Sequence, residues 1–108
     1  MMEIDTNRMD PGSVAVIVPG YNRAQFTQDE ELSFRQLEHF LGRYDKYLVV
    51  PESLAIERPG FQLQRFADMY FGSAAANNKL MLSPTFYHAF RKYRYILIYQ
   101  LDALVFSD

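Results

Sequence analysis

The chain has 108 residues, a formal net charge of −2 at pH 7 and no cysteine. This length fits one domain, and the weakly acidic balance lacks the basic excess of nucleic-acid-binding proteins, so no nucleic-acid partner is expected. The absence of cysteine excludes disulfides, a thiolate nucleophile and a cysteine zinc site. Aromatic residues make up 16% of the sequence, which favours a well-filled core over disorder.

The first twelve residues are polar and lack the apolar segment of a signal peptide. We interpret residues 1–12 as a flexible leader and residues 13–108 as the domain. Apolar runs fall short of the roughly 18 residues that a membrane-spanning helix requires. A cytoplasmic protein without a transmembrane segment is therefore expected.

The N-terminal half predicts a strand, a helix and a second strand. Residues 14–18 are all apolar and are stopped by Pro19-Gly20, which predicts a short buried strand. Thr27 and Glu30 have the spacing of a capping box. The helix that follows is expected to run to about Arg43, with an apolar stripe made by Phe34, Leu37, Phe40, Leu41 and Tyr44. Residues 47–50 predict the second buried strand.

The C-terminal half predicts a weak strand, two short helices and a long last strand. Residues 61–66 alternate imperfectly, as a third strand would. One helix is expected to start at Ser73 or a neighbour and to run through Leu82. Ser83 before Pro84 predicts the start of another helix that reaches about residue 93. That second helix is expected to place four aromatic residues in the core, namely Phe86, Tyr87, Phe90 and Tyr93. The apolar run from Tyr95 to Phe106 predicts the last strand.

This series predicts an α/β fold with a mainly parallel sheet and helices on both faces, in three layers. In the usual strand order of such sheets (three-two-one-four), the first and last strands are neighbours. Ligands of these sheets bind at the carboxyl ends of the strands, where the crossovers leave in opposite directions. Asp102 in the last apolar run and the loop from Pro19 to Arg23 are therefore expected to face one crevice.

Asp102 is the strongest single candidate for a functional residue. An ionised carboxylate in an apolar run is costly unless a metal, a cationic side chain or a hydrogen-bonded turn compensates it. The structural alternative is a turn or cap acid that backbone amides satisfy.

Two sets of residues resemble known proteins. Val14 to Arg23, with Pro19, Tyr21 and Asn22 after the strand, resembles the opening strand and loop of GT-A glycosyltransferases, and Lys79 to Leu82 with residues 95–106 resembles the later half of their nucleotide-binding unit. Over Val14 to Asp108 the chain more closely resembles domain-of-unknown-function family 5672, whose members are GT-A glycosyltransferase-like. The segments that carry this resemblance are Pro51-Glu52-Ser53-Leu54, Asn78 to Ser83, Phe86-Tyr87 and Tyr99 to Ala103.

The resemblance covers only the N-terminal part of such proteins. It implies the nucleotide-binding half of a GT-A, Rossmann-like fold, and a chain truncated before the acceptor side. The implied activity is hexose transfer from a nucleoside-diphosphate sugar to an unknown acceptor. The sequence assigns no catalytic base.

Donor-binding candidates come from the resemblance for Tyr21, Lys79 and Asp102. Asn22 and Arg23 are candidates as loop groups, and Glu52 with Ser53 because they end the second strand, where ribose-binding acids often lie in open α/β sheets. Tyr21 would contact the base, Asn22 and Arg23 the ribose or phosphate, Glu52 with Ser53 the ribose, Lys79 the diphosphate, and Asp102 the donor sugar or a metal. Each has a structural alternative, such as a surface aromatic, an ordinary turn, a loop anchor or a solvated lysine. Mn²⁺ or Mg²⁺ would use Asp102 as a ligand, although Leu104 replaces the second acid of the family's Asp-x-Asp pair.

Other cofactors and other function classes are alternatives to this hypothesis. NAD, flavin and haem are not expected, and no G-x-G-x-x-G follows the first strand. His39 and His88 are expected to be structural or solvent-facing. The alternative function is a non-catalytic fragment or interaction module that self-associates through an exposed last strand, at Leu97, Tyr99 and Leu101. A flavodoxin-like binding protein, with flavin or phosphate affinity independent of Lys79 and Asp102, is a third possibility.

Overall fold

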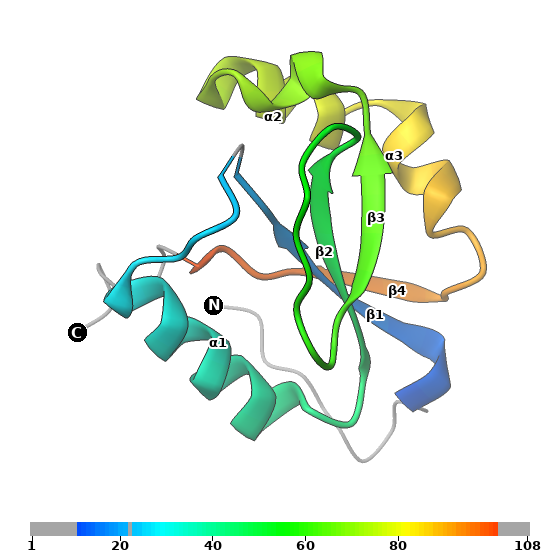
Figure 1. Cartoon of the computed structure of the whole chain (residues 1–108). Coiled ribbons are helices and arrows are strands. Elements are labelled where there is room, and N and C mark those ends of the chain that lie inside the picture. The colour runs from blue at the N-terminus through cyan, green and yellow to red at the C-terminus, as the bar shows by residue number, and fades with distance from the viewer. Residues whose placement is uncertain (1–10, 22, 102–108) are drawn as a thin grey trace.

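The computed structural model describes residues 11–21 and 23–101. Four strands, β1 (Val14–Pro19), β2 (Asp45–Pro51), β3 (Gln62–Phe66) and β4 (Tyr95–Ile98), form one sheet in the order β3-β2-β1-β4 (Figure 1). All three strand pairs are parallel. The predicted α/β class, parallel sheet and strand order are therefore confirmed.

Helices cover both faces of this sheet. α1 (Gln28–Leu41) packs on one face, and α2 (Ala74–Met81) and α3 (Pro84–Ala89) pack on the other (Figure 1). Two short 3₁₀ segments are η1 (Pro11–Ser13) and η2 (Asp68–Phe71). The predicted helix starts are confirmed. Thr27 and Glu30 form a capping box, and the hydroxyls of Ser73 and Ser83 accept hydrogen bonds at the starts of α2 and α3.

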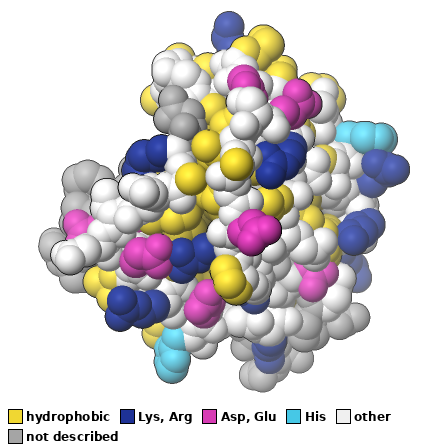
Figure 2. Space-filling model, in the orientation of Figure 1, with side chains coloured by type: hydrophobic (Ala, Val, Ile, Leu, Met, Phe, Trp, Pro, Cys, Tyr) yellow, Lys and Arg dark blue, Asp and Glu magenta, His cyan; other side chains and the backbone are white. Residues whose placement is uncertain are grey.

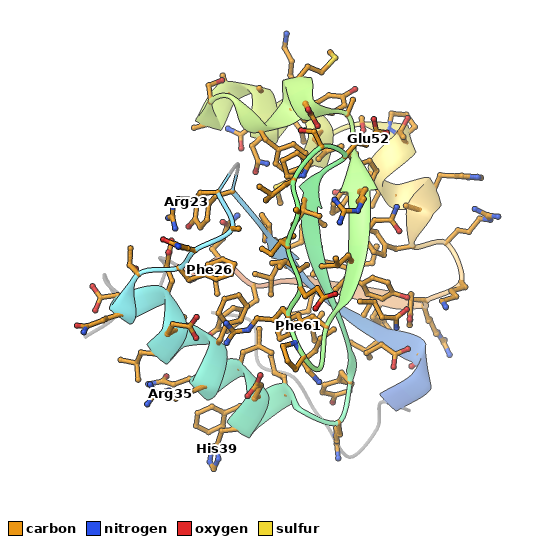
Figure 3. The ribbon with its side chains drawn as sticks, in the orientation of Figure 1. Arg23, Phe26, Arg35, His39, Glu52 and Phe61 are labelled. Atoms are coloured by element: carbon orange, nitrogen blue, oxygen red, sulfur yellow. The ribbon has the colours of Figure 1, made fainter. Side chains whose placement is uncertain are left out.

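The core has two halves because alternate residues of a strand face opposite sides of the sheet. Ala15 and Ile17 of β1 pack with side chains of η2, α2 and α3, whereas Val14, Val16 and Val18 pack with α1. On the α1 side, Phe34 meets the rings of Phe26 and Phe61 edge to face, at centroid distances of 4.8 and 5.3 Å (Figure 3). These contacts hold the β1–α1 loop and the segment before β3 against α1.

Two predicted core residues are exposed instead. The side chain of Phe40 is 70% exposed and that of Tyr87 is 47% exposed. At 3.6 residues per turn, Phe40 lies about 120° around the helix from Phe34, and Tyr87 lies about 100° from Phe86. Both therefore point away from the stripe that meets the sheet. α1 and α3 also end earlier than predicted, at Leu41 and Ala89, although Tyr93 is buried as expected.

The last strand is shorter than the predicted range of residues 95–106. β4 ends at Ile98, and the N–H of Tyr99 makes a further bond of 2.8 Å to the carbonyl oxygen of Ile17. The neighbouring strand β1 then ends at Pro19, which has no N–H to donate. The carbonyl oxygen of Leu101 accepts a hydrogen bond from the Ser33 hydroxyl of α1 instead. Residues 102–106 lie outside the described residues.

β4 is nevertheless at the edge of the described sheet. Of the apolar residues predicted beside this edge, Leu97 in β4 and Tyr99 after it are half-buried against the α1 side of the core, and Leu101 is 1% exposed. None of the helices in the described part of the chain combines the length and apolar character needed to cross a membrane.

Candidate functional site

A cleft of about 400 Å³ lies at the carboxyl ends of β1 and β4, where the strand order predicted a crevice. Its volume falls within the usual range for small-molecule sites, about 300–1,000 Å³. One wall follows β1 and β4, and the other comes from the end of η2 and the first two turns of α2. We call it the first cleft; its lining residues are Pro19, Gly20, Tyr21, Phe71, Gly72, Ser73, Ala74, Asn77, Asn78 and Gln100.

Gly20 lets the chain leave β1 close against β2. Its N–H donates to the carbonyl oxygen of Val49 at 2.7 Å. A Cβ at this position would lie 2.4 Å from that same oxygen, so only glycine fits without a backbone shift. This close approach brings Tyr21 to the wall of the first cleft.

The start of α2 forms the opposite wall. Ser73 caps the helix by accepting a hydrogen bond of 3.1 Å from the N–H of Ala76. Helix N-termini carry a partial positive charge, which favours anions. Asn77 and Asn78, one turn further on, add amide groups that both donate and accept hydrogen bonds. The first cleft thus combines an anion-favouring helix start, neutral polar side chains and the ring of Tyr21.

Arg23 is held by Glu30 in the β1–α1 loop. Its guanidinium makes two hydrogen bonds to the carboxylate, of 2.9 and 2.8 Å, and lies 4.5 Å from the centre of the Tyr21 ring. Burial acts to raise the pKa of Glu30, but the bonds from Arg23 and from the Thr27 N–H outweigh it and leave the pKa below its ordinary value. The hydrogen bonds that Arg23 donates to the Glu30 carboxylate in turn raise the pKa of Arg23.

A second cleft of about 250 Å³ lies at the carboxyl end of β2. Its lining residues are Pro51, Ser53, Leu54, Asp68, Phe71 and Gly72, so the two clefts share Phe71 and Gly72. The carboxylate of Asp68 accepts a bond of 3.0 Å from the N–H of Ser53 and another from the Ser53 hydroxyl. The bonds from the hydroxyl and then the N–H lower the pKa of Asp68.

The structure brings together only some of the predicted donor-binding residues. Tyr21 lines the first cleft, whereas Arg23, Glu52 and Lys79 are exposed and are absent from its described lining. Glu52 lies at the end of the sheet nearest α2, and Arg23 in the loop between β1 and α1 (Figure 3). Asn22 and Asp102 are outside the described residues.

The described lining of the first cleft does not fit a divalent cation. Mn²⁺ and Mg²⁺ prefer carboxylate oxygens, and the described wall contains amides, hydroxyls and apolar groups but no acid. Within residues 11–21 and 23–101, no three His, Cys, Asp or Glu side chains gather as a metal site would require. His39 and His88 are both exposed, which agrees with their expected solvent-facing positions.

Sequence reasoning missed the polar side chains that line the clefts. Asn77, Asn78 and Gln100 in the first cleft and Asp68 in the second were not predicted as site residues. The predicted helix start at or near Ser73 was a usable signal for Asn77 and Asn78, because both lie within two turns of it. Asp68 offered no such signal, because η2 was not predicted.

Charge is mixed over the face shown in Figure 2. Lys and Arg as well as Asp and Glu side chains are visible there, with hydrophobic side chains among them.

Comparisons with known proteins give one match. No curated protein and no solved structure matches the chain. Residues 60–108 match the model of a family described as "Protein of unknown function (DUF5672)". The matched segment, just under half of the chain, includes η2 and α2, which form one wall of the first cleft. The match supports the predicted assignment of the chain to this family.

Proposed function

We propose that the chain binds a nucleoside-diphosphate sugar in the first cleft, as the donor-binding part of a glycosyltransferase-like protein. The observation that carries this proposal is the position of the cleft at the carboxyl ends of β1 and β4, between Tyr21 and the start of α2. A hexose would be transferred from the donor to an unknown acceptor.

Each wall of the cleft would bind a different part of the donor. The ring of Tyr21 offers a flat surface for a base, and the start of α2 suits the diphosphate because of its partial positive charge. The amides of Asn77, Asn78 and Gln100 would hydrogen-bond the hydroxyl groups of the donor. Arg23 would then act mainly through Tyr21, because its guanidinium is bonded to Glu30.

In hexosyl transfer the bond between the anomeric carbon and the diphosphate oxygen breaks, and the acceptor oxygen forms a new bond to that carbon. The acceptor loses its hydroxyl proton to a base, and the departing diphosphate keeps the electron pair. The start of α2 would stabilise the negative charge that develops on the diphosphate. No described residue is assigned as the base. Asp102 stays a candidate ligand of the donor sugar or a metal, outside the described residues.

The proposal is tested by thermal unfolding with UDP, GDP or CDP, each with and without Mn²⁺. A ligand at 100 times its dissociation constant stabilises a protein by about 2.7 kcal/mol, which shifts the midpoint by several degrees in a domain of this size. We expect such a shift with at least one nucleotide. Asp102→Asn, tested alongside, is expected to reduce the shift.

Two matched variants localise the site. Ala74→Glu places a carboxylate in the wall of the first cleft, whereas Ala75→Glu places one in the same helical turn outside the described lining. Both add the same favourable charge to the start of α2. Only Ala74→Glu is expected to abolish the nucleotide shift. The proposed site would be contradicted if no nucleotide shifted the unfolding midpoint of the wild type, or if both variants lost the shift to the same extent.

The second candidate function is an interaction module that self-associates through β4. The observation in its favour is that β4 pairs with β1 on one side and with no described strand on the other. Free strand edges can pair with another chain, and a lysine there opposes this. Sedimentation velocity of the wild type would reveal a dimer that Tyr95→Lys weakens, with Tyr87→Lys on α3 as the control. A monomer at all concentrations would exclude this candidate.

A further inference from the structure

The two clefts adjoin along one edge of the sheet. The first cleft lies at the ends of β1 and β4, the second lies at the end of β2, and β1 is between β4 and β2 in the sheet. Phe71 and Gly72 line both clefts. A ligand that fills the first cleft and continues along this edge toward β2 must therefore pass Gly72.

Local packing does not explain why residue 72 is a glycine. A Cβ at Gly72 would meet no heavy atom within 4 Å, and its φ of −85° is accessible to any residue. Gly20 is the opposite case, because a Cβ there would collide with a backbone carbonyl. The absence of a side chain at Gly72 leaves the passage between the two clefts open.

The second cleft contains a fixed, exposed acceptor of hydrogen bonds. Ser53 holds the Asp68 carboxylate through its N–H and its hydroxyl, with one bond to each oxygen. A carboxylate can accept about four hydrogen bonds in all, so each oxygen of Asp68 retains the capacity for a donor from a ligand. Two acceptors in a fixed orientation match two adjacent hydroxyl groups of a sugar.

We propose that the second cleft binds a sugar with two adjacent hydroxyl groups, accepted by Asp68, in a ligand that extends over Gly72 from the first cleft. This inference rests on the proposed function, which places the base of the same ligand on Tyr21 and its diphosphate at the start of α2. The hexose follows the diphosphate in the donor and so fits this placement directly, whereas the ribose stands between the base and the diphosphate. Because both sugars have the same diol chemistry, the experiment separates them.

The test measures dissociation constants by isothermal titration calorimetry for the wild-type chain, Asp68→Asn, Gly72→Ala and the control Asp29→Asn on α1. The ligands are UDP, GDP and CDP, their 2′-deoxy analogues, UDP-glucose and GDP-mannose. Asp68→Asn is expected to weaken binding about tenfold, as the loss of one charge-assisted hydrogen bond does. Gly72→Ala is expected to weaken it several-fold, and Asp29→Asn to leave it unchanged.

The ligand series identifies which sugar occupies the second cleft. If it is the ribose, each 2′-deoxy analogue binds the wild type about tenfold more weakly than its parent nucleotide. Asp68→Asn then causes no further loss of affinity for the 2′-deoxy analogue. If it is the hexose, the nucleotide sugars bind more tightly than the nucleoside diphosphates, and Asp68→Asn removes only that gain.

Two results would overturn the inference, and they differ in what they say about the proposed function. If neither Asp68→Asn nor Gly72→Ala weakens the binding of any nucleoside diphosphate or nucleotide sugar, the second cleft is rejected and the first cleft stays in place. An absence of binding by the wild type to every ligand would reject both.

Discussion

Gly20 is the residue that lets the chain pass from β1 into the first cleft. We expect Gly20→Ala to destabilise the protein by about 1–3 kcal/mol, as overpacking does, because the new Cβ would meet the Val49 oxygen at 2.4 Å. Urea denaturation measures the change. Gly72→Ala is the matched control: its Cβ meets no neighbour, so its stability should be unchanged or higher by up to about 1 kcal/mol. Equal stability of the two variants would contradict the geometry at Gly20.

Glu30 makes stability depend on pH. Because its pKa is lowered in the folded state, its contribution is present above the ordinary carboxyl pKa of about 4.3 and is lost as the pH falls through the lower, folded value. Glu30→Gln keeps a side chain that can cap α1 but removes the charge that binds Arg23. We expect it to lose about 1–2 kcal/mol at pH 7, in line with bonds to a charged group.

Denaturant midpoints between pH 2 and 7 measure this difference. The difference in denaturant midpoint between the wild type and Glu30→Gln should become smaller below about pH 4, where the carboxylate begins to protonate. A gap that stays constant across the range would mean that Glu30 contributes through packing alone.

At the scale of elements, the stability of α3 depends on side chains that follow its last residue. It has six residues, too few to be stable alone, and the Tyr93 hydroxyl that follows it donates to Asp45 at 2.6 Å and lies 2.8 Å from the Tyr47 hydroxyl. Tyr93→Phe should therefore cost about 1–2 kcal/mol, since it leaves the buried Tyr47 hydroxyl without this partner. Chemical denaturation at pH 7 measures the loss, and Tyr87→Phe on the exposed face of α3 should cost nothing.

The same network predicts an alkaline effect. Burial, followed by the bond to Asp45, raises the pKa of Tyr93. The folded state therefore keeps a proton that an unfolded tyrosine loses above about pH 10, and the stability that Tyr93 contributes declines above that pH. The difference in the free energy of unfolding between the wild type and Tyr93→Phe should become smaller between pH 9 and 11. A difference that grows with pH would contradict the direction of the shift.

The elements were predictable where a local rule decides them. Helix starts are predictable because capping hydroxyls accept bonds from amides a few residues away, as those of Thr27, Ser73 and Ser83 do. The unbroken apolar run of β1 predicts a strand that is buried on both faces of the sheet. The exposure of Phe40 was not predictable in the same way, because spacing alone does not say which side of an apolar stripe meets the sheet. The end of β4 depends on where β1 stops, which is a contact between distant segments.

At the scale of the whole molecule, strand order decided how much of the site could be predicted. The order three-two-one-four places the carboxyl ends of β1 and β4 together, and this alone predicted the crevice beside Tyr21. The sequence did not predict that η2 carries Asp68 to Ser53, fifteen positions earlier in the chain. Nor did it predict that the bond from Ser33 to Leu101 joins α1 to the chain after β4. Both contacts arise only when the sheet is assembled.

The two halves of the core should unfold as one unit, because they share the strands of a single sheet. Phe34 is fully buried on the α1 side and Phe86 is 1% exposed on the other. Phe34→Leu and Phe86→Leu each remove buried atoms and are expected to cost on the order of 1–2 kcal/mol. Since every residue of β1 is buried between the two halves, both substitutions should lower the midpoint of the same transition. Differential scanning calorimetry with near-ultraviolet circular dichroism follows it. Two separate transitions, with each substitution lowering the midpoint of only one of them, would show that the halves of the core unfold independently. One face of the sheet that carries the clefts could then lose its packing while the other face stayed folded.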